Sequence, residues 1–385
     1  MALARTGPFR AQLERCFPDR PFEVEFWDGT LVPATSPNGD AVHFRVRSPR
    51  ALAHALRAPG QLGVGRAYVS GEIEVDDMDR VIRLLDTWKP PPLARRDQLK
   101  LALAAARAAG ITRPPSVPRA ELKPKGPRRT QERDARSVRH HYDLPAEFYA
   151  LFLDESMTYS CAFFSRGATT LEEAQETKLE LVCTKLRLEP GQRVLDVGCG
   201  FGSFALHAAA RHGVHVTGIT LSEPQAQLAR RRAAEAGLAD QIEIRVMDYR
   251  DIADERFDAI ASIGMVEHVG DEKIDLYAER LASLVKPGGL VLNHGIGRLD
   301  PGDVIGGPFS DRYVFPDGAP LQVSRVLAAI ERAGLEPLHV EGFREDYAET
   351  LRHWARRLDD NLDEARRLAG DERVRVWRLY LRAAR

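Results

Sequence analysis

The sequence predicts an α/β protein with a larger C-terminal part, built on a doubly wound parallel sheet, and a smaller N-terminal α+β module. Two observations predict the sheet. From Leu181 onward, short apolar runs alternate with segments of helical composition, which is typical of parallel strands covered by helices on both faces. The first of these runs, residues 193–197, leads directly into a glycine-rich turn. A third observation, the mixture of short alternating and short helical segments before residue 90, predicts the module.

The N-terminal module is expected to span residues 1–90. Apolar and polar residues alternate from Phe22 to Trp27 and again from Val42 to Val46, which predicts two strands. Residues 49–56 have the composition of a short helix, and three glycines between residues 60 and 65 are expected to interrupt the chain. No cluster of reactive side chains is apparent in this module. If the substrate is a lipid, we expect the module to serve lipid or membrane docking.

Residues 91–138 are expected to link the two parts. Residues 93–110 are rich in alanine, leucine and arginine, which predicts a helix. Residues 112–139 carry five prolines and nine basic residues, so this stretch cannot pack a core of its own. It is either a solvated tether, which composition alone favours, or a polybasic strip attracted to anionic phospholipid.

Composition excludes several classes of protein. The 55 basic and 56 acidic residues leave a formal charge of −1, so no overall field draws the chain to nucleic acid. The four cysteines lack the paired spacing of zinc or redox motifs, which favours reduced thiols and a cytoplasmic location. No apolar run reaches the ~18–20 residues that span a bilayer. A lipid substrate would therefore be met from the water side, by a peripherally associated protein.

The glycine-rich turn predicts the cofactor. It begins at Asp196 and places glycines at 198, 200 and 202, a G-x-G-x-G spacing instead of the G-x-G-x-x-G of dinucleotide folds. A cofactor without a pyrophosphate needs only a tight turn that seats an amino acid and a nucleoside. With Asp196, Gly198 and Gly200 as contacts, this pattern resembles the class I S-adenosylmethionine-dependent methyltransferases, which have a Rossmann-like sheet.

The ends of the next two strands supply further candidates. Where this class commonly has an acidic residue for the ribose, the chain has Thr220 and Gln225, which offer both donors and acceptors. Ser222 between them either joins the site or caps the following helix. Asp248 and Tyr249 follow the third strand and are expected to meet the edge and face of the adenine.

Six strings, in order, resemble the cyclopropane-fatty-acyl-phospholipid synthase family, which includes the mycolic acid cyclopropane synthases. They occupy residues 140–143, 157–164, 264–270, 293–297, 311–316 and 346–351. The resemblance runs from about Arg136 to the end of the chain and extends weakly through the N-terminal module. It therefore covers the catalytic domain that we place at residues 139–385.

The resemblance implies two bound groups, S-adenosyl-L-methionine and a catalytic bicarbonate. The bicarbonate would be held by the backbone at Cys161 and Ile296 and by the side chains of Glu267, His294 and Tyr347. The cofactor and the reacting carbon would be lined by Tyr142, Tyr159 and Ser160. The nucleoside and methionine portions would be held by Gly198, Thr220, Gln225, Tyr249 and Ile263.

The implied reaction is transfer of a one-carbon unit to the double bond of an unsaturated acyl chain on a phospholipid. An alkene is a weak nucleophile, so it must be aligned with the sulfonium methyl in a dry pocket. Attack leaves a carbocation that the faces of Tyr159 and Phe163 can stabilise. A base then removes a proton, giving either a cyclopropane or a methylene-branched chain.

Other functions and partners follow from the same residues. The alternatives are a methyltransferase for a small polar acceptor and a lipid-binding module with a vestigial cofactor fold. We expect an anionic membrane surface and a second copy of the chain, in a homodimer, as partners. A separate reductase is expected if the product is a methylene fatty acid.

Two departures from the family pattern carry expectations of their own. The family usually continues with an antiparallel strand where this sequence stops at Arg385, so one edge of the sheet is expected to lack that strand. Gly295 separates His294 from Ile296 where some relatives have a side chain, and this glycine is expected to enlarge the pocket.

Overall fold

The computed structural model describes residues 6–35, 41–110, 115–122, 126, 130–131, 133, 144–253, 255–299 and 307–385. The chain forms two compact units. The first comprises residues 1–122, 307–314 and 369–384, and the second comprises residues 123–306 and 315–368 together with Arg385. None of the helices in the described part of the chain combines the length and the apolar character that crossing a bilayer demands.

The first unit is an α+β fold around a four-stranded sheet, in agreement with the prediction for the N-terminal module. The strand order is β2-β1-β3-β4, with β1 and β3 parallel and the other two pairs antiparallel. The strands are β1 (Phe22–Glu25), β2 (Leu31–Val32), β3 (Val42–Val46) and β4 (Ile73–Val75). The helices are α1 (Gly7–Cys16), α2 (Arg50–Arg57), α3 (Gln61–Val69), α4 (Met78–Thr87), α5 (Arg95–Ala109) and α13 (Ser310–Tyr313).

The expectation that glycines interrupt the chain after residue 60 is wrong, because α3 runs through two of them. A Cβ on Gly63 would lie 2.2 Å from the carbonyl oxygen of Ala58, and one on Gly65 would lie 2.4 Å from the Phe309 ring. The two glycines therefore permit close packing of α3 against its neighbours. In this position the absence of a side chain matters more than the low helix propensity of glycine.

The second unit is a parallel α/β sheet with the strand order β7-β6-β5-β8-β9. Its strands are β5 (Arg193–Val197), β6 (His215–Thr220), β7 (Ile242–Val246), β8 (Phe257–Ile263) and β9 (Val285–His294). Among the described residues no strand pairs with the outer edge of β9.

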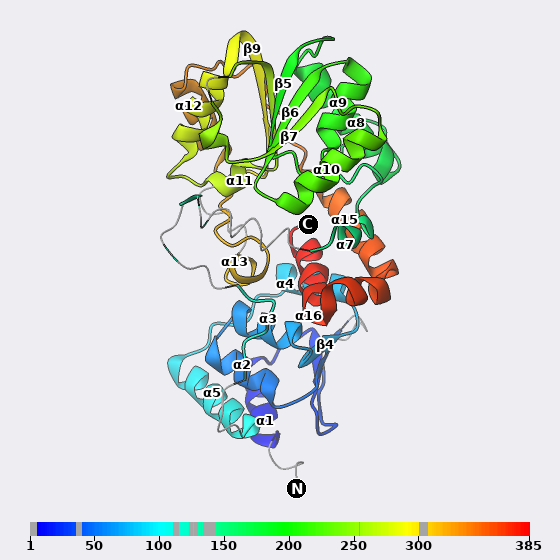
Figure 1. Ribbon diagram of the computed structural model, residues 1–385. Helices are drawn as coiled ribbons and strands as arrows, with labels where there is room; N and C mark the ends of the chain where they lie inside the picture. Colours follow the sequence, from blue (N-terminus) through cyan, green and yellow to red (C-terminus); the bar gives the residue numbers. More distant parts are fainter. Residues whose placement is uncertain are drawn as a thin grey trace. The chain divides into compact units, whose positions relative to one another are not determined.

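Helices cover both faces of this sheet, which confirms the doubly wound fold (Figure 1). One face carries α8 (Leu171–Lys185), α9 (Ser203–His212) and α10 (Glu223–Glu235), and the other carries α12 (Ile274–Leu284) and α14 (Val323–Arg332). The remaining elements of this unit are α7 (Ala146–Ala150), the 3-10 turn η1 (Tyr249–Asp251), α11 (Val266–Val269) and α15 (Arg344–Asp360). Helix α16 (Leu362–Ala383) is kinked at Gly370, and its residues from 369 onward belong to the first unit.

The strand order reverses between β5 and β8. After β5, the chain adds β6 and then β7 on one side of that strand. It then adds β8 and β9 on the other side. In open parallel sheets the loops diverge at such a point and leave a crevice at the carboxyl ends of the strands. The glycine turn at residues 198–202 lies at this crevice.

Candidate active site

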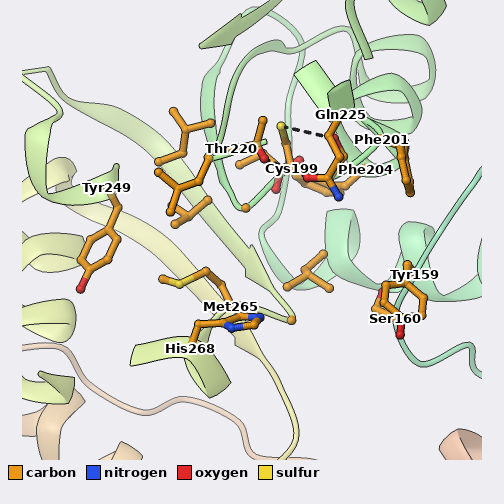
Figure 2. A pocket seen from close by; sticks show the side chains of 18 of the residues that line it. Tyr159, Ser160, Cys199, Phe201, Phe204, Thr220, Gln225, Tyr249, Met265 and His268 are labelled. Atoms are coloured by element: carbon orange, nitrogen blue, oxygen red, sulfur yellow. Dashed lines mark hydrogen bonds between the residues drawn. The ribbon is translucent and has the colours of Figure 1, made fainter. Parts of the chain in front are cut away.

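A cavity lies at the carboxyl ends of β5, β6 and β8, and side chains from separate loops surround it (Figure 2). Ten of the eleven residues predicted to bind the cofactor line it: Tyr159, Ser160, Asp196, Gly198, Gly200, Thr220, Gln225, Asp248, Tyr249 and Ile263. The eleventh, Tyr142, lies outside the described residues. The structure therefore gathers residues that the sequence spreads over more than one hundred positions.

The glycine turn has a backbone conformation that residues with side chains rarely adopt. Gly198 has φ +82° and Gly200 has φ +54°, both in the left-handed region that favours glycine. The turn is fixed from β6, because the N–H groups of Gly198 and Cys199 both donate to the carbonyl of Ile219, at 3.0 Å and 2.9 Å. Gly198 thus presents bare backbone to the cavity.

The polar residues after β6 form a small hydrogen-bonded group. The Thr220 hydroxyl donates to Gln225 Oε1 at 2.9 Å, and both residues are buried. Ser222 caps α10, since its hydroxyl accepts from the Gln225 N–H at 3.4 Å. Of the two interpretations of Ser222, capping is therefore the one that the structure bears out, whereas Thr220 and Gln225 line the cavity.

The pair after β7 is arranged differently from the expectation. The carboxylate of Asp248 accepts from the guanidinium of Arg250 at 2.6 Å and 2.8 Å and caps η1 through the Arg250 N–H. Arg250 also lies 5.5 Å from the centre of the Tyr249 ring. Asp248 lines the cavity with its charge balanced by Arg250, so its carboxylate positions this loop.

The loop that carries Tyr159 and Ser160 is held by two buried residues of α8 that the sequence analysis missed. The side-chain amide of Gln175 donates to the Ser160 carbonyl at 2.9 Å. The Lys178 ammonium donates to the Ser160 hydroxyl at 3.0 Å and also lines the cavity. In the sequence both residues resemble the polar face of an amphipathic helix, and only tertiary packing buries them.

Two opposite charges are buried in the cavity wall. Burial raises the pKa of the Asp196 carboxyl to about 7, and its Oδ2 has no hydrogen-bond partner among the described residues. Burial also lowers the pKa of the Lys178 ammonium to about 8. Each group loses hydration that a zwitterionic ligand could replace, and the methionine portion of S-adenosylmethionine carries both an ammonium and a carboxylate.

Asp196→Asn is expected to stabilise the cofactor-free protein at alkaline pH. The folded-state pKa of about 7 exceeds the ~3.9 of an unfolded aspartate, so the folded chain binds the extra proton between these values. Stability from this carboxyl is complete below pH ~4 and is lost as the pH rises through 7. The variant should gain ~1–3 kcal/mol over wild type at pH 8.5, the usual penalty for a buried polar group left unpaired, and less at pH 5.

Urea unfolding at the two pH values measures this difference. Asp240→Asn, on an exposed loop, is the control and should match wild type at both. If Asp196→Asn raises the free energy of unfolding equally at pH 5 and pH 8.5, the charge of the buried carboxylate does not destabilise the wild-type protein.

The residues predicted to hold the base begin with Glu267, on the short helix α11. Its Oε1 accepts from the Ile296 N–H at 2.8 Å, while its Oε2 is buried without a hydrogen-bond partner among the described residues. Burial raises the pKa of this carboxyl. Two of the residues predicted to hold the bicarbonate thus contact each other. A bound anion would have to share the Ile296 N–H group with Glu267.

The expectation that Gly295 enlarges the pocket is wrong. A Cβ on Gly295 would lie 2.4 Å from Cγ1 of Val266 and 3.2 Å from Oε2 of Glu267. Val266 fills the space that a side chain at residue 295 would need. The glycine therefore lets β9 approach α11 closely enough for Ile296 to bond Glu267.

His294 stands at the end of β9, next to an aromatic pair. Its ring centre is 5.8 Å from that of Phe163, which stacks on Phe343 at 3.8 Å. Burial, helped by the charges of Lys178 and Lys185, lowers the pKa of this imidazole to about 3, so it is neutral at physiological pH. Its Nδ1 is buried and has no partner among the described residues. A neutral imidazole can donate one hydrogen bond here without bringing a charge.

Cys161 and Tyr347 are the remaining residues predicted to hold the base. The Cys161 thiol lies 3.8 Å from the Phe343 carbonyl oxygen, and burial raises the pKa of this thiol to about 12, which excludes a thiolate nucleophile at neutral pH. Tyr347 is on the first turn of α15 and packs edge-on against Trp354, whose ring centre is 5.1 Å from that of Tyr159. Aromatic contacts thus connect the base residues to the cofactor cavity.

Met265 and His268 also line the cavity, and both were missed as cofactor contacts (Figure 2). They flank Glu267 in the sequence, at the end of β8. Since α11 is a single turn, residues on both sides of Glu267 can face the crevice while Glu267 faces β9. Their position directly after a central parallel strand is the signal that could have found them.

Similar sequences and structures are known for most of this chain. Residues 129–385 match the family described as mycolic acid cyclopropane synthetase. A probable fatty acid methyltransferase of Mycobacterium tuberculosis is 39% identical over 95% of this chain and 87% of its own length. The cyclopropane-fatty-acyl-phospholipid synthase of Escherichia coli K12 is 34% identical over 83% of this chain and 78% of its own. A solved cyclopropane synthase of M. tuberculosis superposes with a TM-score of 0.61 and 32% identity, covering 64% of this chain and 90% of that one.

Proposed function

The chain belongs to the mycolic acid cyclopropane synthetase family, and from this premise we propose that it adds a one-carbon unit to the double bond of an unsaturated acyl chain carried on a phospholipid. It is an S-adenosylmethionine-dependent methyltransferase. The observation that carries the proposal is the pairing of the cofactor cavity with a group that has two buried polar atoms, Glu267 Oε2 and His294 Nδ1, without hydrogen-bond partners in the part of the chain that the structure describes. A small polar acceptor would need no such group beside an aromatic wall.

The cavity fits S-adenosylmethionine, which supplies an electrophilic methyl group on its sulfonium. We propose that Gly198 and Gly200 admit its amino acid portion and that Thr220 and Gln225 meet the ribose hydroxyls. Tyr249 would lie against the adenine. A mycolic acid cyclopropane synthase has been solved in complex with SAH, the cofactor without its methyl, and with CTAB, at 32% identity to this chain.

The aromatic residues around the reacting carbon would stabilise the positive charge that follows attack by the alkene. Tyr159 stacks toward Trp354, and Phe163 stacks on Phe343, so both rings are fixed before substrate binds. Fixed ring faces attract a cation without further ordering. The same apolar walls keep water, a competing nucleophile, away from the cation.

We propose that bicarbonate accepts the final proton and is held by Glu267, His294 and Tyr347, with the backbone at Cys161 and Ile296. The structure fits an anion for a specific reason. A raised pKa makes the Glu267 carboxyl a better acceptor for the hydroxyl proton of bicarbonate, and the neutral His294 imidazole can donate a hydrogen bond to an oxygen of the anion. Two buried polar atoms would gain partners at once.

Incubation with isotopically labelled S-adenosylmethionine and oleoyl phospholipid vesicles tests the function. We expect label in the acyl chain, and NMR of the released fatty acid to distinguish a cyclopropane from a methylene branch. A methylene product would call for a separate reductase. Label confined to head groups or to small polar acceptors would contradict the proposal.

We further propose that the enzyme works as a homodimer at a membrane surface and that the first unit docks there. The exposed face of α5 supports docking, because Leu99 is 61% and Leu103 is 50% exposed, four residues apart on one face. Arg96 and Arg107 are exposed on the same helix. Apolar side chains flanked by arginines are typical of helices that lie in the surface of an anionic bilayer.

The basic strip after residue 112 needs one correction as a docking element. Arg133 was expected to contribute, but its guanidinium bonds both carboxylate oxygens of Asp317 at 2.6 Å and is largely buried. An arginine held in this way is unavailable to lipid head groups. Arg128 and Arg129 lie outside the described residues, and their role in docking stays a proposal.

Leu99→Ser together with Leu103→Ser is expected to weaken binding to anionic vesicles by at least ~10-fold, since each buried leucine contributes ~1.5–3 kcal/mol. Salt should weaken wild-type binding, because surface charge attraction fades over a Debye length of ~8–10 Å. Flotation of vesicles measures both effects. Leu338→Ser, equally exposed in the second unit at 62%, is the control. Equal binding to neutral and anionic vesicles, unaffected by salt, would rule out electrostatic docking.

A further inference from the structure

Four side chains that commonly bind metal ions gather between α8 and α9, apart from the residues that line the cofactor cavity. Glu180 and Cys183 are three residues apart on α8 and therefore lie on one face of that helix. His207 and His212 come from α9, which covers the same face of the sheet (Figure 1). The sequence spacing gave no sign of this group, because the two pairs come from different helices.

The distances between these side chains suit a metal ion. The sulfur of Cys183 and one ring nitrogen from each histidine lie within 4.8 Å of one another. Glu180 Oε2 is 3.1 Å from Nε2 of His207 and 3.2 Å from Nε2 of His212. In a tetrahedral zinc site, bonds of ~2.0–2.3 Å place neighbouring ligand atoms about 3.3–3.6 Å apart. Small side-chain rotations would therefore close the group around an ion.

Burial and charge also suit a metal ion. Cys183 is fully buried, the side chains of His207 and His212 are only 10% and 20% exposed, and that of Glu180 is 48% exposed. An ion can thus enter from the Glu180 side and be shielded on the others. A thiolate and a carboxylate together cancel the two positive charges of the ion, so the occupied site would add no net charge beside the core.

We propose that Cys183, His207, His212 and Glu180 form a structural zinc site that ties α8 to α9. One sulfur, two imidazole nitrogens and one carboxylate oxygen make four ligands of the types that zinc takes. Hydrogen bonds alone can explain why Glu180 contacts both histidines. They do not explain why the Cys183 sulfur lies beside the same histidines. The site is independent of the proposed reaction and lies outside its cavity.

The consequence concerns the walls of the cofactor cavity. Helix α8 carries Gln175 and Lys178, which hold the Ser160 loop, and α9 begins at Ser203, directly after the glycine turn. The Ser203 hydroxyl also donates to the Ser156 carbonyl at 2.6 Å. An ion that fixes the two helices would therefore fix two walls of the cavity.

Cobalt and zinc titrations of the full-length protein, purified without a histidine tag and treated with a chelator, test the site. We expect one equivalent of Co²⁺ to bind with a thiolate charge-transfer band and the visible spectrum of a tetrahedral ion. Zinc should displace it and raise the melting temperature. Cys183→Ser should abolish the charge-transfer band and weaken zinc affinity by at least ~100-fold, since even residues that only support metal ligands cost 10–100-fold.

His212→Asn, at a partly exposed helix end, is the second variant and should weaken zinc binding similarly. Cys16→Ser and His215→Gln, at a cysteine and a histidine outside the group, should bind zinc like wild type. Far-ultraviolet circular dichroism reports whether each variant has folded, independently of the cofactor cavity. Less than one bound ion, a cobalt spectrum without the thiolate band, or equal zinc affinity in wild type and folded His212→Asn would overturn the site.

Discussion

Glu267→Gln is expected to lower the turnover number by ~10²–10⁴-fold, the usual contribution of a positioned acid–base group, while S-adenosylmethionine affinity stays near that of wild type. Glutamine keeps the shape of the side chain and can still accept the Ile296 N–H through its Oε1. It cannot exchange a proton, and it places an amide nitrogen where the buried Oε2 now has no partner. The expected loss is therefore one of chemistry and not of folding or cofactor binding.

Single-turnover kinetics with vesicle substrate, together with calorimetry of cofactor binding, separate these two effects. Glu272→Gln, five residues further along and exposed, is the matched control and should retain wild-type turnover. Removing bicarbonate from the buffer should slow wild type and leave Glu267→Gln almost unchanged. Full activity in Glu267→Gln, or a wild-type rate indifferent to bicarbonate, would contradict the proposed base site.

The residues that line the cavity could be predicted because their signals are local. The end of a parallel strand, a glycine that needs positive φ and a polar residue directly after the strand are all visible in a few adjacent positions. Gly198, Thr220 and Tyr249 follow three successive strands in this way, and the order of the strands brings them to one cavity.

Other features could not be predicted, since they depend on pairings between distant segments. Lys178 and Arg133 look like ordinary surface charges in the sequence, yet one is buried against Ser160 and the other is held by Asp317. The sequence also predicts a break at Gly63, but helix α3 continues through this residue. Glycine is needed there because α2 lies too close for any side chain. In each case a tertiary contact overrides the local preference.

The proposed base site lies between these two cases. The family resemblance supplied its residues, but the sequence does not show that Ile296 already bonds Glu267 or that Val266 fills the space beside Gly295. Both follow from the close approach of β9 to α11. The resulting site has fixed walls, and its unpartnered atoms are the groups that a small anion would engage.

Gly198→Val is expected to weaken S-adenosylmethionine binding by ~10²-fold or more. The residue has φ +82°, which a β-branched side chain rarely adopts, and its Cβ would lie 3.3 Å from Cγ of Met265, which also lines the cavity. The valine methyl groups would project further into the space that the cofactor needs. Calorimetry on the folded variant measures the loss.

Backbone strain alone must be separated from this steric effect, and Gly191 provides the means. It has the same φ of +82°, no atom lies within 4 Å of its Cβ position, and it does not line the cavity. Gly191→Val should therefore lose a similar amount of stability through strain while keeping wild-type cofactor affinity. If both variants fold and bind the cofactor equally well, the turn at Gly198 does not seat the ligand, and the cofactor would have to approach the sheet from elsewhere in the cavity.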